Sequence, residues 1–359
     1  MKTISVCMIV KNEEDVLKET LESVKDVVDE IIIVDTGSID RTKEIATQFT
    51  EHVYDFEWCD DFAAARNVSF SYASKDYILF MDADDYLPEK ERKKLNELKH
   101  SLDDSVDAVT MFTVMSVDEY GNPVFQFRRH RLVKRSKQFK WYGAVHEYLA
   151  VSGNIVHSDI RIHHRTVKNK TLVRKSRNLN IYKKRLEKGE VFSPRDLFYY
   201  ANELKDNGFC REAIEQYQKF LDTKRGWVED NIRACIYLAD CYRALGEREK
   251  EVDALVQSLA YDLPRPEVSC RIGDMYKEKK MYHKAILWYT LAIGLRQDES
   301  MGFQLVPYST WYPHLQCSVC YWHIGNKELA YQHHLRAKEY RPRDSLILKN
   351  ERFFDRERE

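Results

Sequence analysis

Residues 77–87 read YILFMDADDYL, an apolar run that ends abruptly in acid. The stretch from Tyr77 to Met81 has the composition of a strand that passes through a protein core. It stops at three carboxylates within four positions, Asp82, Asp84 and Asp85. Buried carboxylates are costly unless they are paired, hydrogen-bonded or bound to a cation. We therefore expect this strand to end at a functional site.

Around this strand, the first 190 residues alternate strand and helix patterns. Continuous apolar runs occupy Ile4–Val10 and Glu30–Asp35, and helical spacing occupies Glu13–Val28 and Asp40–Phe49. Strands that are apolar throughout are buried on both faces, so we predict a mostly parallel, Rossmann-like α/β sheet. Ligands of such sheets bind at the carboxyl ends of the strands. Three predicted strand ends are polar, at Lys11–Glu13, Asp35–Ser38 and Asp82–Asp85.

From about residue 193 onward the pattern is helical, and it repeats. Each copy aligns a small residue, then an aromatic residue or Leu three positions later, then a turn. The small anchors are Ala201, Ala239, Gly273 and Ser318, which lie 38, 34 and 45 residues apart. This spacing is typical of tetratricopeptide helix pairs, whose ideal period is about 34 residues. We predict two domains, 1–190 and 191–359, the second an all-α repeat domain. An unrelated helical bundle is the alternative.

Composition excludes several function classes. The 57 Lys and Arg nearly balance the 58 Asp and Glu, so the chain has no global basic field for nucleic acid. No apolar stretch approaches the ~20 residues needed to span a membrane. The eight cysteines sit mostly within apolar patterns, which favours reduced thiols in a cytoplasmic protein. Cys317 and Cys320 form a CxxC without a second pair, so we expect helix packing rather than a zinc site.

The acidic triplet Asp82-Ala83-Asp84 has two interpretations. It could be a solvated turn before a helix at Pro88–Leu98, because a lone DxD is common. Its place after a buried strand favours a metal site instead. An extended chain would put Asp82 and Asp84 on the same side. Two carboxylates there could bind a divalent cation, which in turn could hold a diphosphate.

Five segments follow one another in an order typical of one enzyme family. They are ISVCMIVKNEE at the start, IIIVDTGSIDRT, DFAAARN at 61–67, FMDADD at 80–85 and WYGAVHE at 141–147. On these residues the chain resembles the family 2 glycosyltransferases, which have the GT-A fold. The second half resembles the repeat domain of some members, including bacterial transferases that glycosylate cysteine or serine of small peptides.

The resemblance implies roles for residues around a nucleotide sugar. Asp35 would accept a hydrogen bond from the base, and an acceptor carboxylate favours uracil N3–H. Asn12 and Glu13 would frame the base or ribose, and Gly37 would permit the tight turn beside the nucleotide. Arg66 would contact ribose or phosphate oxygens, unless it lies on a helix surface.

The resemblance also implies a site for Mn²⁺ or Mg²⁺. Asp84 would be the main ligand, and Asp82 would reach the metal or the ribose, while Asp85 would only cap the following turn. His164 would complete the metal site or touch the diphosphate. Its neighbour His163 would face the other way, since adjacent strand residues point to opposite sides. The Arg-Thr pair that follows departs from the family pattern, so the choice between the two histidines stays open.

The segment WYGAVHE would supply the catalytic groups. Glu147 would be the general base that deprotonates the acceptor, unless it braces a loop. His146 is a second candidate base or a support for Glu147. Trp141 would stack on the acceptor, unless it simply packs. Segment 127–140 has no acidic residue and carries seven Lys and Arg. It could be a solvated hairpin, or it could form a positive rim for an anionic donor. Lys168 and Lys170 could also meet phosphates, or they could lie in a solvated loop.

We therefore expect a cytoplasmic, inverting, metal-dependent glycosyltransferase. The donor would be a nucleotide sugar, UDP-hexose or UDP-HexNAc, and the acceptor a peptide or protein, at Ser or Cys. The repeats would hold the acceptor or build a homodimer. Two alternatives stay open: a transferase for a cell-surface or lipid-linked glycan, and an inactive scaffold that binds a peptide through its repeats.

Overall fold

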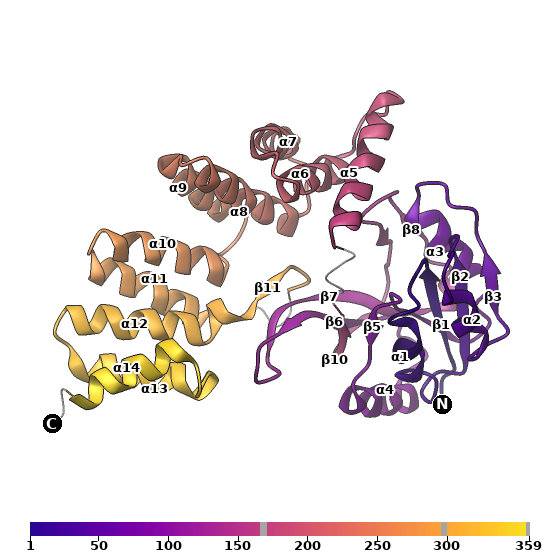
Figure 1. The fold of residues 1–359 in the computed structure, drawn as a ribbon, viewed down its shortest axis with the longest axis horizontal. Coiled ribbons are helices and arrows are strands. Elements are labelled where there is room, and N and C mark those ends of the chain that lie inside the picture. The colour runs from indigo at the N-terminus through magenta and orange to yellow at the C-terminus, as the bar shows by residue number, and fades with distance from the viewer. Residues whose placement is uncertain (166–170, 296–299, 357–359) are drawn as a thin grey trace. The chain divides into compact units, whose positions relative to one another are not determined.

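The computed structural model describes residues 1–165, 171–295 and 300–356, and it divides into two compact units. Unit 1 contains Met1–Ser116 and Gln126–Phe192, and unit 2 contains Val117–Phe125 and Ser193–Glu359. In Figure 1 the strands gather in the first half of the chain, and helices fill the second. The main division of the chain falls between Phe192 and Ser193. The short segment 117–125, which counts with unit 2, was not anticipated.

Unit 1 is built on a mixed sheet with the strand order β3-β2-β1-β4-β7-β6-β10-β5. The strands are β1 (Ile4–Val10), β2 (Glu30–Asp35), β3 (Val53–Asp55), β4 (Tyr77–Phe80), β5 (Asp85–Tyr86), β6 (Ala108–Val117), β7 (Pro123–Lys134) and β10 (Ile155–His164). Strands β3, β2, β1 and β4 are parallel to one another, and β10 is parallel to β6. β7 and β5 run antiparallel to their partners β4 and β10. The sheet is thus mostly parallel, as predicted.

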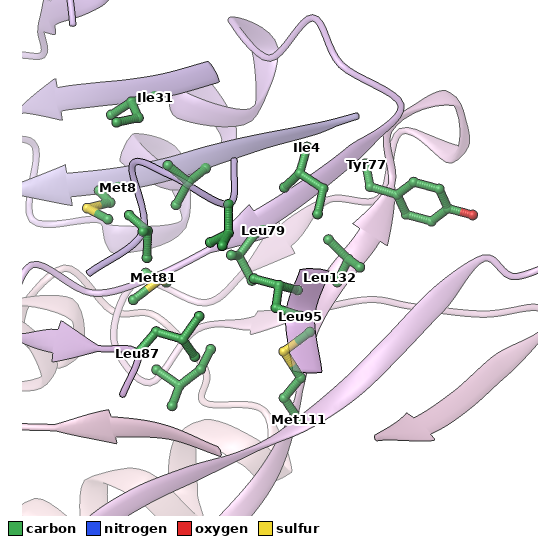
Figure 2. Packing of buried hydrophobic residues seen from close by; sticks show 14 of the residues in the cluster. Ile4, Met8, Ile31, Tyr77, Leu79, Met81, Leu87, Leu95, Met111 and Leu132 are labelled. Atoms are coloured by element: carbon green, nitrogen blue, oxygen red, sulfur yellow. The ribbon is translucent and has the colours of Figure 1, made fainter. Parts of the chain in front are cut away.

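Both faces of the central strands are buried. One face packs the side chains drawn in Figure 2, among them Ile4, Met8, Leu79 and Leu132. The other face packs Cys7, Ile32, Phe80 and Val133. The apolar side chains of these strands are therefore removed from water on both sides, which explains their continuous apolar runs.

The helices of unit 1 are α1 (Leu17–Glu22), α2 (Thr42–Thr47), α3 (Phe62–Ser71), α4 (Glu89–Ser101) and α5 (Thr171–Glu187). A two-stranded hairpin of β8 (Trp141–Tyr142) and β9 (Tyr148–Leu149) completes the unit. The helix expected over 13–28 is shorter than predicted. After Leu21 the chain continues as turns, in which Leu21 O accepts from both Val24 N (3.1 Å) and Lys25 N (3.0 Å).

Unit 2 is a succession of helix pairs. The helices are α6 (Pro194–Asp206), α7 (Cys210–Asp222), α8 (Val228–Ala244), α9 (Arg248–Gln257), α10 (Pro266–Glu278), α11 (Tyr282–Gly294), α12 (Trp311–His323), α13 (Lys327–Tyr340) and α14 (Ser345–Arg356). The four predicted anchors lie on α6, α8, α10 and α12, the first helix of each pair, and all are buried. Small residues there allow close helix approach, as in tetratricopeptide repeats.

The cysteines of the CxxC pack in the core of unit 2. Cys317 and Cys320 lie on α12 and are both buried in a cluster with Tyr289 and Ala285. Within the described ranges, no helix combines the length and the apolar character that a membrane crossing requires.

Candidate active site

The side chain of Asp35 ends β2 and shapes the loop behind it. Its Oδ1 accepts hydrogen bonds from the backbone N–H groups of Gly37 (2.9 Å) and Ser38 (2.8 Å). Gly37 has φ +97, a conformation that side-chain-bearing residues rarely adopt. Asp35 is 1% exposed, and its Oδ2 has no hydrogen-bond partner among the described residues. A buried acceptor atom is therefore left at the carboxyl end of β2.

The residues that follow β1 are tied to this same loop. Asn12 accepts a hydrogen bond on its Oδ1 from Ile39 N (2.9 Å), and its own N–H donates to Ser38 Oγ (2.9 Å). Glu13 N donates to Thr42 Oγ1 (2.7 Å). The structure thus places Asn12 and Glu13 beside the loop after Asp35. This is the neighbourhood in which the sequence analysis expects a nucleotide.

Three side chains that can ligate a metal meet beyond β4. One ligand atom each from Asp84, Asp85 and His164 lies within 4.8 Å of the others. His164 Nδ1 is 3.3 Å from Asp84 Oδ1 and 3.3 Å from Asp85 Oδ1. Burial alone would lower the pKa of His164, but its hydrogen bond to Asp85 and the nearby carboxylate charges raise it above the ordinary value. The negative charge of the carboxylates therefore favours a positive charge among these three side chains.

The antiparallel pairing of β5 and β10 brings these residues together. His164 lies opposite Asp85 in this register, and His163 lies opposite Tyr86. The ring of His163 is 5.3 Å from the Tyr86 ring. Of the two neighbouring histidines, His164 is the one that the structure brings to the carboxylates.

The chain at Asp82–Asp85 is not extended, so Asp82 and Asp84 do not lie on the same side as expected. Asp85 N donates to Asp82 O (3.0 Å), which turns the chain and breaks the strand alternation. Asp82 therefore lies outside the group of Asp84, Asp85 and His164. Asp85 does more than cap a turn. It is fully buried, and its Oδ2 accepts from Arg131 Nη1 (2.9 Å) and from Asp82 N (3.0 Å).

Arg66 of α3 bridges two carboxylates from distant parts of the chain. Its Nη2 is 2.6 Å from Asp82 Oδ1, and its Nε is 2.6 Å from Glu147 Oε1. Arg66 is 7% exposed, so it does not lie on a helix surface. Burial alone would raise the pKa of Asp82, but the charges of Arg66, Arg131 and Arg129 lower it well below its usual range. The bridge is therefore an ion pair between a fixed cation and ionised Asp82.

The hairpin of β8 and β9 carries Glu147 in its loop. His146 has φ 52 and Gly143 has φ 99, so the loop between the two strands turns sharply. Tyr142 and Tyr148 face each other across the hairpin with ring centroids 5.9 Å apart, and both are exposed. The loop delivers Glu147 to Arg66, while His146 is half-buried beside it.

Trp141 is buried in the core of unit 1. It is 4% exposed, and its ring packs edge-on against Phe80 (centroids 4.7 Å apart) and Phe70 (5.7 Å). Its indole ring therefore offers no face to an acceptor. Of the two roles left open for Trp141, packing is the one that agrees with its burial. Neighbouring strand residues point to opposite sides, and on this hairpin Tyr142 is the outward residue.

The seven cations of residues 127–140 do not act as one surface. Arg131 is buried against Asp85, and Arg128 donates to Ser158 O (2.6 Å). Arg129 Nη1 is 3.7 Å from Asp82 Oδ2, and its side chain is 37% exposed. Neither a solvated hairpin nor a continuous rim describes this segment. Arg129 and Arg131 were not singled out from the sequence as partners of the carboxylates. Their spacing of two along a strand is the signal that puts both on one face.

Two expected phosphate contacts cannot be placed. Lys168 and Lys170 lie outside the described residues.

Comparisons with known proteins agree with this arrangement. Residues 5–157 match the family model described as Glycosyl transferase family 2. A TPR repeat-containing protein of Synechococcus elongatus is 38% identical over 147 residues, which cover 41% of this chain and 35% of that protein. The SPbeta prophage-derived glycosyltransferase SunS of Bacillus subtilis is 29% identical over 257 residues, 66% of this chain and 58% of that protein.

This chain therefore spans less than two thirds of either relative's length. Among solved structures, MamA is 19% identical, covers 48% of this chain and 85% of its own, and has a TM-score of 0.37. The helix pairs themselves, rather than this likeness, define unit 2. For the N-terminal part of the chain, the motifs, the sheet and the family match agree, so residues 5–157 are similar to the family 2 glycosyltransferases.

Proposed function

We propose that the protein is an inverting, metal-dependent glycosyltransferase that moves a hexose or HexNAc from a UDP-sugar to a peptide or protein. The observation that carries this proposal is the convergence of Asp84, Asp85 and His164 beyond β4, inside the matched domain. Asp35 ends β2, and both β2 and β4 are parallel partners of β1. The nucleotide and the metal would therefore bind at the same edge of the sheet.

The free acceptor on Asp35 supports the nucleotide part of the proposal. A buried carboxylate oxygen without a partner costs free energy, and a ligand that donates a hydrogen bond to it removes that cost. Uracil offers such a donor at N3. Asn12, Glu13 and Gly37 line the adjoining loops and would frame the base or ribose. The donor in this proposal is a sugar nucleotide of the cytoplasm.

The chemistry of the ligand group fits a divalent cation. Two carboxylates and one imidazole supply oxygen and nitrogen atoms, a mixture that suits Mn²⁺ better than Mg²⁺. Asp84, Asp85 and His164 would hold the ion, and Asp82 would face the ribose. A bound cation would offset the charge that develops on the leaving diphosphate.

Glu147 is the general base of the proposal, with His146 as the second candidate. The acceptor hydroxyl or thiol gives its proton to Glu147. Its oxygen or sulfur then bonds to the anomeric carbon of the sugar. The bond from that carbon to the diphosphate oxygen breaks, and the electron pair leaves with the nucleoside diphosphate. Attack on the face opposite the leaving group inverts the anomeric centre.

The acceptor is proposed to lie on the helix pairs of unit 2. Stacked helical repeats form extended surfaces that suit an extended peptide. A glycan acceptor is the competing substrate, and an inactive peptide-binding scaffold is the competing function. The repeats could also join two copies of the chain into a homodimer.

A melting experiment tests the donor site. Wild-type protein, Asp84→Asn and the exposed control Asp26→Asn would be heated with UDP-, GDP- and dTDP-sugars, with and without Mn²⁺. A ligand at 100 times its Kd stabilises the folded state by about 2.7 kcal/mol, which raises the Tm of a domain of this size by roughly 5–10 °C. We expect a manganese-dependent rise with the UDP-sugar for wild type and Asp26→Asn only. No rise with any nucleotide would favour the scaffold.

A further inference from the structure

We propose that Arg66 is a positioning residue that holds the base Glu147 in place for proton transfer, rather than a ligand of the nucleotide. This inference rests on the proposed function, because it assigns a partner to the proposed base. It differs from the expectation from sequence, in which Arg66 contacts ribose or phosphate oxygens.

Two hydrogen bonds of Arg66 hold carboxylates on either side of it. Its Nε and Nη2 each lie 2.6 Å from a carboxylate oxygen, one on Glu147 and the other on Asp82. The side chains of Arg66 and Glu147 are 9% and 11% exposed, so water competes little for this pair. Charge-assisted bonds of this length are strong and directional. Glu147 is thereby fixed through Oε1, which leaves Oε2 as the oxygen for the acceptor proton.

The guanidinium group is itself held in place. Its carbon lies 4.9 Å from the ring centroid of Trp141 and 5.8 Å from that of Phe80. Both rings are buried. A lysine in this position would present one ammonium group instead of a planar fork, and could not satisfy two carboxylates in the same geometry.

Helix α3 also fastens the hairpin that carries Glu147. Asn67, the next residue after Arg66, donates from Nδ2 to Trp141 O (3.0 Å), and its Oδ1 accepts from Trp141 N (2.9 Å). Phe62 N donates to Ala144 O (2.9 Å). One helix therefore holds the backbone of the loop through Asn67 and Phe62, and its catalytic side chain through Arg66.

If Arg66 positions Glu147, replacing Arg66 should mainly lower kcat. If Arg66 binds the nucleotide, the replacement should mainly weaken donor binding. Misplacing a catalytic group by about 1 Å can cost roughly 100-fold in rate. We therefore expect Arg66→Lys and Arg66→Ala to lower kcat by about 100-fold. Because Arg66 also holds Asp82, the Kd for the donor, measured by calorimetry, should rise by no more than it does in Asp82→Asn. Added guanidinium should restore part of the kcat of Arg66→Ala, and the Arg66→Ala/Glu147→Gln double variant should be no slower than Glu147→Gln.

Arg185 provides a matched control in the same unit. It pairs with Glu190 (Nε to Oε2, 2.7 Å) and lies over the rings of Tyr182 (5.6 Å) and Phe192 (5.1 Å). Arg185→Ala removes a more exposed stacked ion pair that involves none of Arg66, Asp82 and Glu147. We expect it to lower the Tm without changing kcat or donor Kd.

Several results would overturn the inference. A loss of donor affinity of tenfold or more with kcat retained would make Arg66 a nucleotide ligand, and full activity in Arg66→Lys would remove the positioning role. If Arg66→Ala does not fold, Arg66→Lys decides. If wild type neither binds nor uses any sugar nucleotide, the proposed function fails. The ion pair is tested separately by melting the Arg66→Lys and Glu147→Gln variants and their double variant, where strictly additive losses of Tm would exclude it.

Discussion

Four carboxylates crowd one end of the sheet, and the guanidinium groups decide how each is used. Asp82 and Glu147 share Arg66, and Asp85 is paired with Arg131. Asp84 Oδ1 lies 3.3 Å from His164 Nδ1, in the group of Asp84, Asp85 and His164. At the scale of single residues, the same end of the sheet therefore holds both an arginine-bridged pair of carboxylates and a group of side chains that can ligate a metal.

Glu147→Gln is expected to separate donor binding from transfer. Glutamine keeps the shape of the side chain, and its carbonyl oxygen still accepts the bond from Arg66 Nε, but the amide cannot take a proton. We expect kcat to fall by about 10²–10⁴-fold, the usual contribution of a general base. The donor-induced rise in Tm should be unchanged, and Glu190→Gln serves as the control. Transfer at the normal rate would show that Glu147 is not the base, and His146→Gln would be measured next.

The helices of unit 2 pack at distances set by their small anchors. An alanine Cβ at Gly273 of α10 would lie 2.7 Å from Tyr289 Cε1 of α11. Tyr289 is fully buried, and its hydroxyl donates to Asp274 Oδ1 (2.7 Å), so the ring has little freedom to move. At the scale of elements, this glycine is required by packing and not by a turn.

Gly273→Ala should therefore destabilise unit 2 although alanine is the better helix former. Overpacking costs typically 1–3 kcal/mol, and the helix propensity returns at most about 1 kcal/mol. We expect a net loss of about 1–2 kcal/mol in the free energy of unfolding, measured by urea denaturation. Gly294→Ala is the matched control, because an added Cβ there meets nothing within 4 Å. Equal stability of the two variants would contradict the packing argument.

A histidine pair joins α12 and α13 and makes their packing sensitive to pH. The Nδ1 atoms of His314 and His333 are 2.9 Å apart. Burial, together with the charges of His333 and Arg336, lowers the pKa of His314 to about 4. Burial also lowers the pKa of His333. The folded state therefore favours neutral imidazoles at this contact.

Stability of unit 2 should fall as the pH falls from about 6.5 to about 4. The unfolded chain binds a proton at His314 near pH 6.5, while the folded chain does so only near pH 4, so acid favours unfolding in this window. Urea midpoints at pH 7.5 and pH 5 would show it. His314→Gln should lose less stability than wild type, whereas the exposed His283→Gln should behave like wild type.

The parts of the site that could be predicted are those that follow from periodicity. Continuous apolar strands indicate a parallel sheet, and strand ends then bring Asp35 and Asp84 to one edge. The bridge through Arg66 has no such signal, because its partners lie 16 and 81 residues away in the chain. The role of Asp85 depends on a turn that an extended-chain rule cannot foresee. On a strand as short as β8 there is too little alternation to tell whether Trp141 or Tyr142 faces inward.

At the scale of the whole molecule, unit 2 is assembled from two separate stretches of chain. Its early stretch, Val117–Phe125, contributes Glu119, whose carboxylate pairs with Arg341 Nη2 (2.8 Å). The hydroxyl of Tyr120 accepts from Arg343 N (2.8 Å). The Phe125 ring lies 5.5 Å from the Phe303 ring. A cut at residue 192 would therefore divide unit 2 as well as separate it from unit 1.

A fragment of residues 1–192 should aggregate for this reason. It keeps Val117–Phe125 but lacks the helices that this segment contacts, so apolar and strand-forming backbone is left without partners. Replacing 117–125 by an Asn-Gly turn should restore a monomer, measured by light scattering at increasing concentration. If the unmodified fragment is equally monomeric, the contacts of the segment contribute little.

The position of Val117–Phe125 also has a consequence for how the protein is made. Glu119 leaves the ribosome 222 residues before Arg341. At about 5–20 residues per second, this segment waits roughly 10–45 seconds for its partner. During that interval the nascent chain presents an incomplete binding surface, which is the kind of segment that a chaperone would protect until synthesis reaches α13.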